Sequence, residues 1–326
     1  MLRIVFMNQK KLRFWMIVGI VLIIAYGFLT NRGRIARQIF GVKSGVYLEG
    51  RNVAGMLPAE LSRMVAAMAE KVNREARDAW YLPETGEIIP ARPGRRVNIA
   101  ETVQQVCLAE AGSRLKLKVA EVAPRISEDF FKPVYHGNPN LSKVALTINV
   151  AWGEEHLPDM LKVLKEEKVK ATFFFVGTWV KAFPELVREV AAAGHEVANH
   201  GMFHGHPLQM RRDGLRRLIT ENTSLLSQTI GKAPARLFAP PYGEINTEIA
   251  ATAGELGYRT VMWSVDTVDW KNPTPETLLN RVLTKIEPGG IILMHPTVSA
   301  RLALRPLVQS LKKRGLQPVT VSELLR

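Results

Sequence analysis

His200 and His204 are the residues whose types and spacing most directly suggest chemistry. Side chains four residues apart face the same way on a helical turn, so these two imidazoles form a workable pair of metal ligands. A histidine pair alone is a weak indication of a metal site. Polar and turn residues also gather in four other short segments, 149–155, 240–243, 266–270 and 293–295, and this convergence strengthens it.

Each of these segments follows a predicted strand. From residue 143 onward, apolar strands alternate with helical patterns, and the strands are expected at 144–150, 172–176, 196–199, 236–239, 260–265, 290–294 and 318–321. This alternation predicts an α/β fold, either a parallel (β/α) barrel or a doubly wound sheet. In both folds functional residues lie at the carboxyl ends of the strands, so the segments above should meet at one edge.

Charge and cysteine content exclude several classes of protein. The 326 residues carry a formal charge of +14, but residues 1–48 hold eight basic and no acidic side chains. The remaining excess is too small for a dedicated nucleic-acid binder, so no nucleic-acid partner is expected. Cys107 is the single cysteine, which excludes an internal disulfide and a zinc site built from several thiolates.

The uncharged apolar run 14–29 lies between Arg13 and Arg32. Its length is near the short limit for a membrane span, and no cleavage site of small residues follows it. We therefore predict an uncleaved signal anchor within a basic region, 1–43, which makes the membrane a partner; a buried core helix is the alternative. The rest of the chain is expected on the extracytoplasmic side.

Residues 44–126 predict a small α+β module without a catalytic constellation. Leu61, Met64, Val65 and Met68 recur at the spacing of one helical face. The order of its elements, including Gly94-Arg-Arg-Val-Asn98, loosely resembles a peptidoglycan-binding module found beside wall enzymes; an unrelated spacer is the alternative. Residues 127–140, with their proline and glycine breaks, predict a linker to a domain at 141–326.

Four motifs in this last domain resemble those of a known family. They are Gly194-His-Glu-Val-Ala-Asn-His-Gly-Met-Phe-His204, Phe238-Ala-Pro-Pro-Tyr-Gly243, Trp263-Ser-Val-Asp-Thr-Val-Asp-Trp270 and Ile291-Ile-Leu-Met-His295. Their order and spacing resemble the polysaccharide deacetylases, the nodulation-type domain of carbohydrate esterase family 4, and most closely a subgroup of spore-forming bacteria. The resemblance implies a distorted (β/α) barrel and a deacetylase-type hydrolase acting on N-acetylated glycan, peptidoglycan or chitin-like, in an envelope or sporulation setting.

The resemblance also implies a role for each matched residue and a divalent metal such as zinc. The metal ligands would be His200 and His204. His295 would be the general acid, tuned by the charge of Asp269. The backbone amide of Tyr242 would donate to the oxyanion, and Trp270 and Leu293 would line the sugar groove.

Three positions depart from the family pattern. Asn149 stands at the catalytic base, Val150 at the third metal ligand, and Ala239 at the arginine that holds the base. We expect impaired or lost hydrolysis and a role in binding wall glycan. The alternative is an active, metal-dependent deacetylase in which Glu154 replaces the missing ligand, although Glu154 also fits as a first-turn acid of the next helix.

Overall fold

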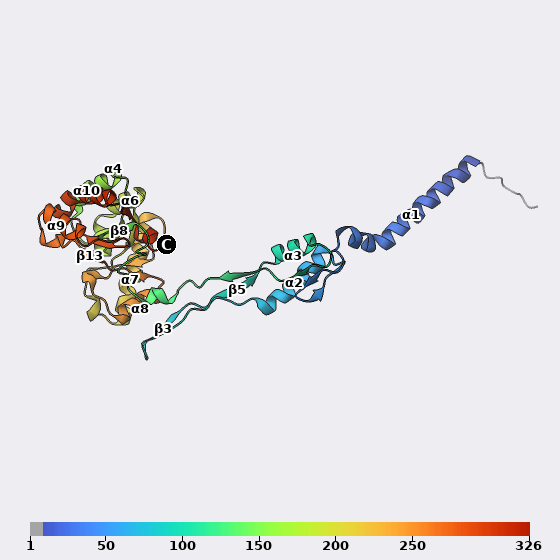
Figure 1. Cartoon of the computed structure of the whole chain (residues 1–326), viewed down its shortest axis with the longest axis horizontal. Helices are drawn as coiled ribbons and strands as arrows, with labels where there is room; N and C mark the ends of the chain where they lie inside the picture. Colours follow the sequence, from blue (N-terminus) through green and yellow to red (C-terminus); the bar gives the residue numbers. More distant parts are fainter. Residues whose placement is uncertain (1–8) are drawn as a thin grey trace, which may run out of the picture. The chain divides into compact units, whose positions relative to one another are not determined.

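The computed structural model describes residues 9–326, and the side chains of that range except those of 9–12 and 28–30. It divides into two compact units (Figure 1). The first comprises the chain up to Arg77 together with Arg92–Ala123, and the second comprises Asp78–Ala91 together with Pro124–Arg326. Residues 1–8 of the predicted basic N-terminus lie outside the described residues.

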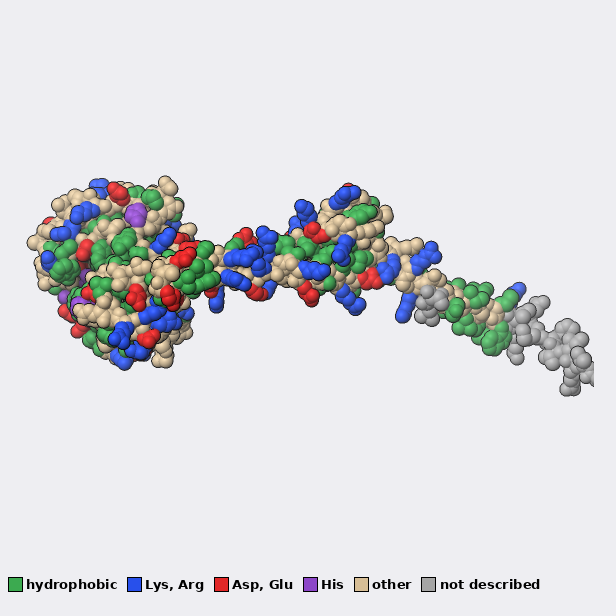
Figure 2. Space-filling view, turned by 90° about the horizontal axis from the view of Figure 1, so that it is seen from below, with side chains coloured by type: hydrophobic (Ala, Val, Ile, Leu, Met, Phe, Trp, Pro, Cys, Tyr) green, Lys and Arg blue, Asp and Glu red, His purple; other side chains and the backbone are tan. Residues whose placement is uncertain are grey.

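The helix α1 (Gln9–Phe40) contains the apolar run of the predicted signal anchor. Its hydrophobic side chains are exposed, Trp15 to 61% and Ile23 to 72%, and form a hydrophobic surface in Figure 2. In the described part of the chain no single helix is long and apolar enough to cross a bilayer. Arg13–Gly27 and Asn31–Phe40, bent by 61°, together pass this test by length and composition. The anchor therefore stays a prediction.

Beyond α1, the first unit is a small α+β structure. Its elements are β1 (Tyr47–Leu48), β2 (Arg51–Asn52), α2 (Pro58–Val72), β5 (Gly94–Val97), α3 (Ile99–Leu108), β6 (Arg114–Leu115) and β7 (Val119–Val122). The predicted face of α2 is the buried one: Leu61 and Val65 are fully buried, and Met64 and Met68 pack against the same core. The Glu60 carboxylate accepts the Leu57 amide and caps the start of this helix.

The hairpin β3 (Trp80–Leu82) and β4 (Glu87–Ile89) belongs to the second unit, although its residues fall inside the predicted 44–126 module. Tyr81 and Ile88 pack in one cluster with Phe131 and Ala251. Phe131 ends the 3-10 turn η1 (Glu128–Phe131), so part of the predicted linker is packed structure.

The second unit is built on one parallel sheet. Its strands are β8 (Lys143–Val150), β9 (Thr172–Phe175), β10 (Glu196–Asn199), β11 (Leu237–Phe238), β12 (Arg259–Thr260), β13 (Val265–Asp266), β14 (Ile291–Met294) and β15 (Gln317–Val319). They pair in the order β12-β11-β10-β9-β8-β14-β13, with β15 beside β8. Among the described strands none joins β12 to β13, so the curled sheet stays open. The predicted α/β fold with a parallel sheet is confirmed.

Helices cover the sheet (Figure 1). They are α4 (Leu157–Glu166), α5 (Gly177–Ala182), α6 (Pro184–Ala192), α7 (Arg212–Ile230), α8 (Thr247–Glu255), α9 (Pro275–Leu283), α10 (Val298–Lys313) and α11 (Val321–Leu324). Leu146, Ile148 and Val150 lie in the core cluster that includes α4, α6, α9 and α10, whereas Ala145 lies in a separate cluster. The two-residue period of β8 thus separates the two faces of the sheet.

The prediction of one strand at 260–265 is wrong. β12 pairs with β11 and β13 pairs with β14, at opposite ends of the strand order. Residues 261–264 therefore cross the gap at which a closed barrel would join, and they carry Trp263 into the site described next.

Candidate functional site

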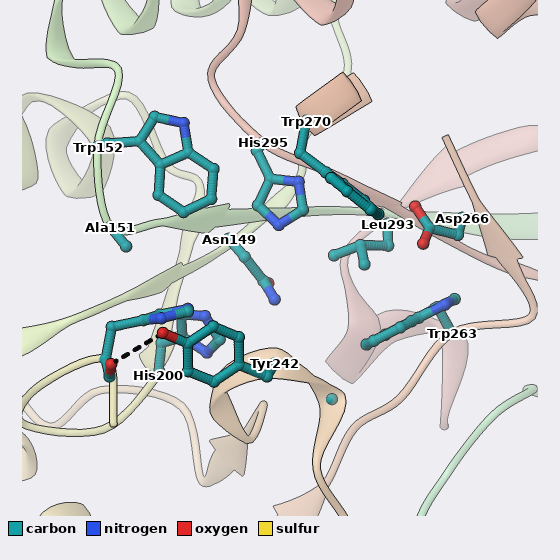
Figure 3. A pocket seen from close by; sticks show the side chains of 12 residues that line it. Asn149, Ala151, Trp152, His200, Tyr242, Trp263, Asp266, Trp270, Leu293 and His295 are labelled. Atoms are coloured by element: carbon teal, nitrogen blue, oxygen red, sulfur yellow. Dashed lines mark hydrogen bonds between the residues drawn. The ribbon is translucent and has the colours of Figure 1, made fainter. Parts of the chain in front are cut away.

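The predicted segments meet in one pocket at the carboxyl ends of the strands. Its volume is about 640 Å³, within the usual range of ligand sites. Its lining consists of polar, histidine and aromatic side chains with a few small residues: Asn149, Ala151, Trp152, His200, His204, Tyr242, Gly243, Trp263, Asp266, Trp270, Leu293 and His295. Figure 3 shows Asn149, His200, Tyr242 and His295 around the same cavity.

His200 follows β10 directly and is held rigidly. Asn199 accepts the Gly201 amide through its side-chain oxygen at 2.7 Å, which fixes the turn after the strand. The His200 Nδ1–H donates to the Ala239 carbonyl oxygen at 2.7 Å, because a carbonyl can only accept. Nε2 of His200 is then the unprotonated nitrogen, a lone pair available to a ligand.

Burial keeps this histidine pair neutral. His200 is 2% exposed, and desolvation lowers its pKa to about 3. Desolvation, followed by the nearby His295, also lowers the pKa of His204. The His200 and His204 ring centroids are 5.3 Å apart, so the structure brings the predicted pair together.

Asp269 and His295 form a second predicted pair. The Asp269 carboxylate is fully buried and accepts two hydrogen bonds from His295, from the backbone amide at 2.6 Å and from Nδ1 at 2.9 Å. This arrangement fixes the orientation of the imidazole and leaves Nε2 for a bound molecule, as a histidine acid requires. The turn before Asp269 passes through Val268 at φ 55°, a conformation that a β-branched residue rarely adopts.

The three positions predicted to depart from the family pattern, Asn149, Val150 and Ala239, carry no ionisable side chain. Asn149 lines the pocket at 4% exposure, and its Oδ1 has no hydrogen-bond partner among the described residues. Ala239 offers only a methyl group where an arginine would hold a base. Val150 is fully buried in a hydrophobic core cluster and is absent from the pocket lining.

The donor set does not fit the family's three-ligand metal site. Within residues 9–326 no group of three histidine, cysteine or acidic side chains is close enough to hold an ion. Glu154, the candidate replacement ligand, is not brought to His200 and His204. The loop after β8 ends at Gly153, which has φ 80° and packs against the Pro296 carbonyl. Glu154 then begins the 3-10 turn that leads into α4, and it does not line the pocket.

Aromatic rings form much of the pocket wall. The Trp152 indole stacks on the His295 imidazole, with centroids 5.2 Å apart and planes 14° apart. Tyr242 adopts φ 59° and packs edge-on against His204 at 4.3 Å. Trp270 is half exposed at the rim. The residues predicted to bind substrate, Tyr242, Trp270 and Leu293, therefore do line the pocket.

Sequence reasoning gave no role to Trp152, Trp263 or Asp266, which also line the pocket. Asp266 is the last residue of β13 and could have been found by the strand-end rule. Trp152 falls in the predicted segment 149–155 and Trp263 begins one of the family motifs. The place of each ring depends on the loop that ends at Gly153 and on the crossing segment 261–264, which the sequence does not show.

Residues 136–261 match the family model described as polysaccharide deacetylase. YlxY, an uncharacterized protein of Bacillus subtilis (strain 168), is 37% identical over 264 residues, which cover 78% of this chain and 82% of YlxY. The chain belongs to the polysaccharide deacetylase family. A peptidoglycan-N-acetylglucosamine deacetylase of Bacillus cereus is also 37% identical, over 58% of this chain and 91% of that protein.

Solved structures of this family include BA3943 of Bacillus anthracis, described as a carbohydrate esterase family 4 pseudoenzyme. It is 33% identical, with a TM-score of 0.59 over 82% of this chain and 95% of that one. A mutant of BA3943, described as having restored enzymatic activity, matches equally well at 32% identity. The predicted family is therefore confirmed.

Proposed function

We propose that this chain is a glycan-binding member of the polysaccharide deacetylase family whose hydrolysis of N-acetyl groups is impaired or lost. The observation that carries the proposal is Asn149 in the pocket at the position of the base. A carboxamide has no useful proton affinity near neutral pH, so it cannot take a proton from an attacking water.

The pocket residues that match the family motifs support glycan binding. The Asp269–His295 pair, the exposed rings of Tyr242 and Trp270, and a cavity of about 640 Å³ offer a polar anchor and flat apolar faces to a sugar ring. The relatives named as peptidoglycan deacetylases support cell-wall glycan, N-acetylated peptidoglycan or a chitin-like polymer, as the ligand.

We also propose the setting in which this binding occurs. The apolar run in α1 supports a membrane anchor, and a wall ligand requires that the soluble units lie outside the membrane. Residues 44–126 would then act as an additional wall-binding module. An envelope or sporulation role is supported by the resemblance to members from spore-forming bacteria.

The test is acetate release by the full chain, purified in detergent, from N-acetylglucosamine oligomers with zinc supplied. The wild type is compared with a triple variant, Asn149→Asp, Val150→Asp and Ala239→Arg, and with the same variant carrying His295→Gln. Because Val150→Asp places a carboxylate in the core, thermal melting with zinc present verifies that both variants are folded. Because a positioned base contributes about 10²–10⁴-fold, we expect wild-type release at least a hundredfold below the triple variant. Glycan binding by the wild type is measured in parallel.

Wild-type turnover that rivals the triple variant and needs His200 would overturn the loss of hydrolysis. Absence of both turnover and glycan binding would overturn the binding role. A triple variant whose activity survives His295→Gln would show that the restored reaction does not use the predicted acid.

A further inference from the structure

The charged side chains that line the pocket are unbalanced. Asp266 is the one carboxylate among its lining residues, and no lysine or arginine of the described chain lines it. Asp266 Oδ1 accepts the Val268 amide at 2.7 Å, and no described cation forms an ion pair with this carboxylate. The other nearby carboxylate, Asp269, is already bonded twice to His295.

The family pattern holds positive charge here that this chain does not. A metal ion and an arginine would balance the carboxylates, but Ala239 replaces the arginine and the donor set does not fit the metal. The two aspartates of the pattern are replaced as well, and Asp266 stays. The pocket is therefore left with a negative charge that a cationic ligand would compensate.

The surroundings of Asp266 also favour a cation. Figure 3 shows its carboxylate on the same side of the pocket as the rings of Trp263 and Trp270. Faces of tryptophan rings attract ammonium groups, and Trp263 lines the pocket with no described cation over its ring.

An N-acetylated sugar does not meet these requirements. Its acetamido nitrogen is neutral, so on binding it would leave the Asp266 carboxylate partly desolvated without a counter-charge, which is unfavourable. A hexosamine with a free amino group is an ammonium ion below its own pKa, and it brings both a positive charge and N–H donors to a carboxylate.

We propose that this pocket preferentially binds the de-N-acetylated hexosamine units of the glycan, with Asp266 as the partner of the sugar ammonium. The inference rests on the proposed glycan-binding function and makes it more specific. A family member that cannot remove acetyl groups would then recognise the product of its active relatives.

The test compares two ligands that differ only at nitrogen, the tetramers of glucosamine and of N-acetylglucosamine. Their affinities for the full chain in detergent are measured by calorimetry at pH 6. We expect the amino tetramer to bind about tenfold more tightly, as one charge-assisted hydrogen bond allows. The formal charge of +14 repels a cationic oligosaccharide, so a general attraction cannot produce this preference.

Asp266→Asn keeps an oxygen for the Val268 amide and removes only the charge, so it should bring the affinity ratio down toward one. The matched control is Asp159→Asn, a carboxylate on α4 that pairs with Arg301 outside the pocket, and it should keep the wild-type ratio. Thermal melting of both variants verifies that they are folded.

Equal or tighter binding of the N-acetyl tetramer would overturn this inference and leave the glycan-binding function intact. An amino preference that persists in Asp266→Asn would also overturn it. If neither tetramer binds, the proposed function itself fails.

Discussion

Val150→Asp tests how the third metal position is built in this chain. Val150 is fully buried among hydrophobic side chains at the end of β8 and is absent from the pocket lining. A carboxylate there has no described cation within the core cluster to pair with. An uncompensated buried charge costs about 3–5 kcal/mol of unfolding free energy. In a unit of about 200 residues this corresponds to a melting temperature lower by roughly 6–20 °C.

The assay is thermal melting followed by circular dichroism at pH 7 with a chelator present. Val150→Asn separates polarity from charge and should melt between the wild type and Val150→Asp. Val298→Asp makes the same change at an exposed position in the first turn of α10, where an acid is favourable, and should leave the melting temperature within about 2 °C.

The penalty of Val150→Asp should also shrink as the pH falls. Burial raises the folded-state pKa of an introduced carboxyl, so the neutral acid forms first in the folded chain. A melting temperature within 2 °C of the wild type at pH 7 would refute the reasoning, because it would mean that the side chain at 150 reaches water or a counter-ion.

Two further predictions concern the buried ionisable groups. Asp269→Asn keeps one acceptor oxygen and replaces the other by an NH2 group, so it removes one of the two bonds to His295. It should lower the unfolding free energy by about 1–3 kcal/mol, seen as a lower urea midpoint with an unchanged slope; an unchanged midpoint contradicts it. Burial lowers the pKa of His195 to about 4 and that of His200 to about 3, so the unfolded chain binds more protons below pH 6.5. The free energy of unfolding should therefore decrease as the pH is lowered, by up to about 2 kcal/mol per histidine between pH 6.5 and 5. His195→Gln should flatten this dependence of the urea-derived unfolding free energy on pH. A profile as steep as the wild type in that variant would exclude His195 as a cause.

The fold was largely predictable because parallel strands buried on both faces are apolar runs of recognisable length. β8, β9, β10 and β14 were located to within one residue at each end. The segment 260–265 was not resolved into two strands, because β12 and β13 are held by different neighbours and no local pattern encodes those pairings.

The site was predictable where a side chain lies at or just past the carboxyl end of a strand. His200 and His295 directly follow β10 and β14, Asn149 is the penultimate residue of β8, and the structure brings all three into one pocket. Trp152 could not be placed in this way, because its stacking on His295 depends on the loop before Gly153. For Glu154 the sequence offered two interpretations, a replacement ligand or a first-turn acid of the next helix, and the structure agrees with the second.

The placement of the β3–β4 hairpin has a consequence for the order of events during synthesis. The hairpin is made before the first unit is complete, yet its partner Ala251 in the second unit follows Ile88 by roughly 160 residues. At about 5–20 residues per second this partner is made roughly 8–30 seconds later. An isolated two-stranded ribbon is barely stable in water, so Tyr81 and Ile88 lack the cover of Ala251 throughout this interval, and a chaperone or protease can bind them there first.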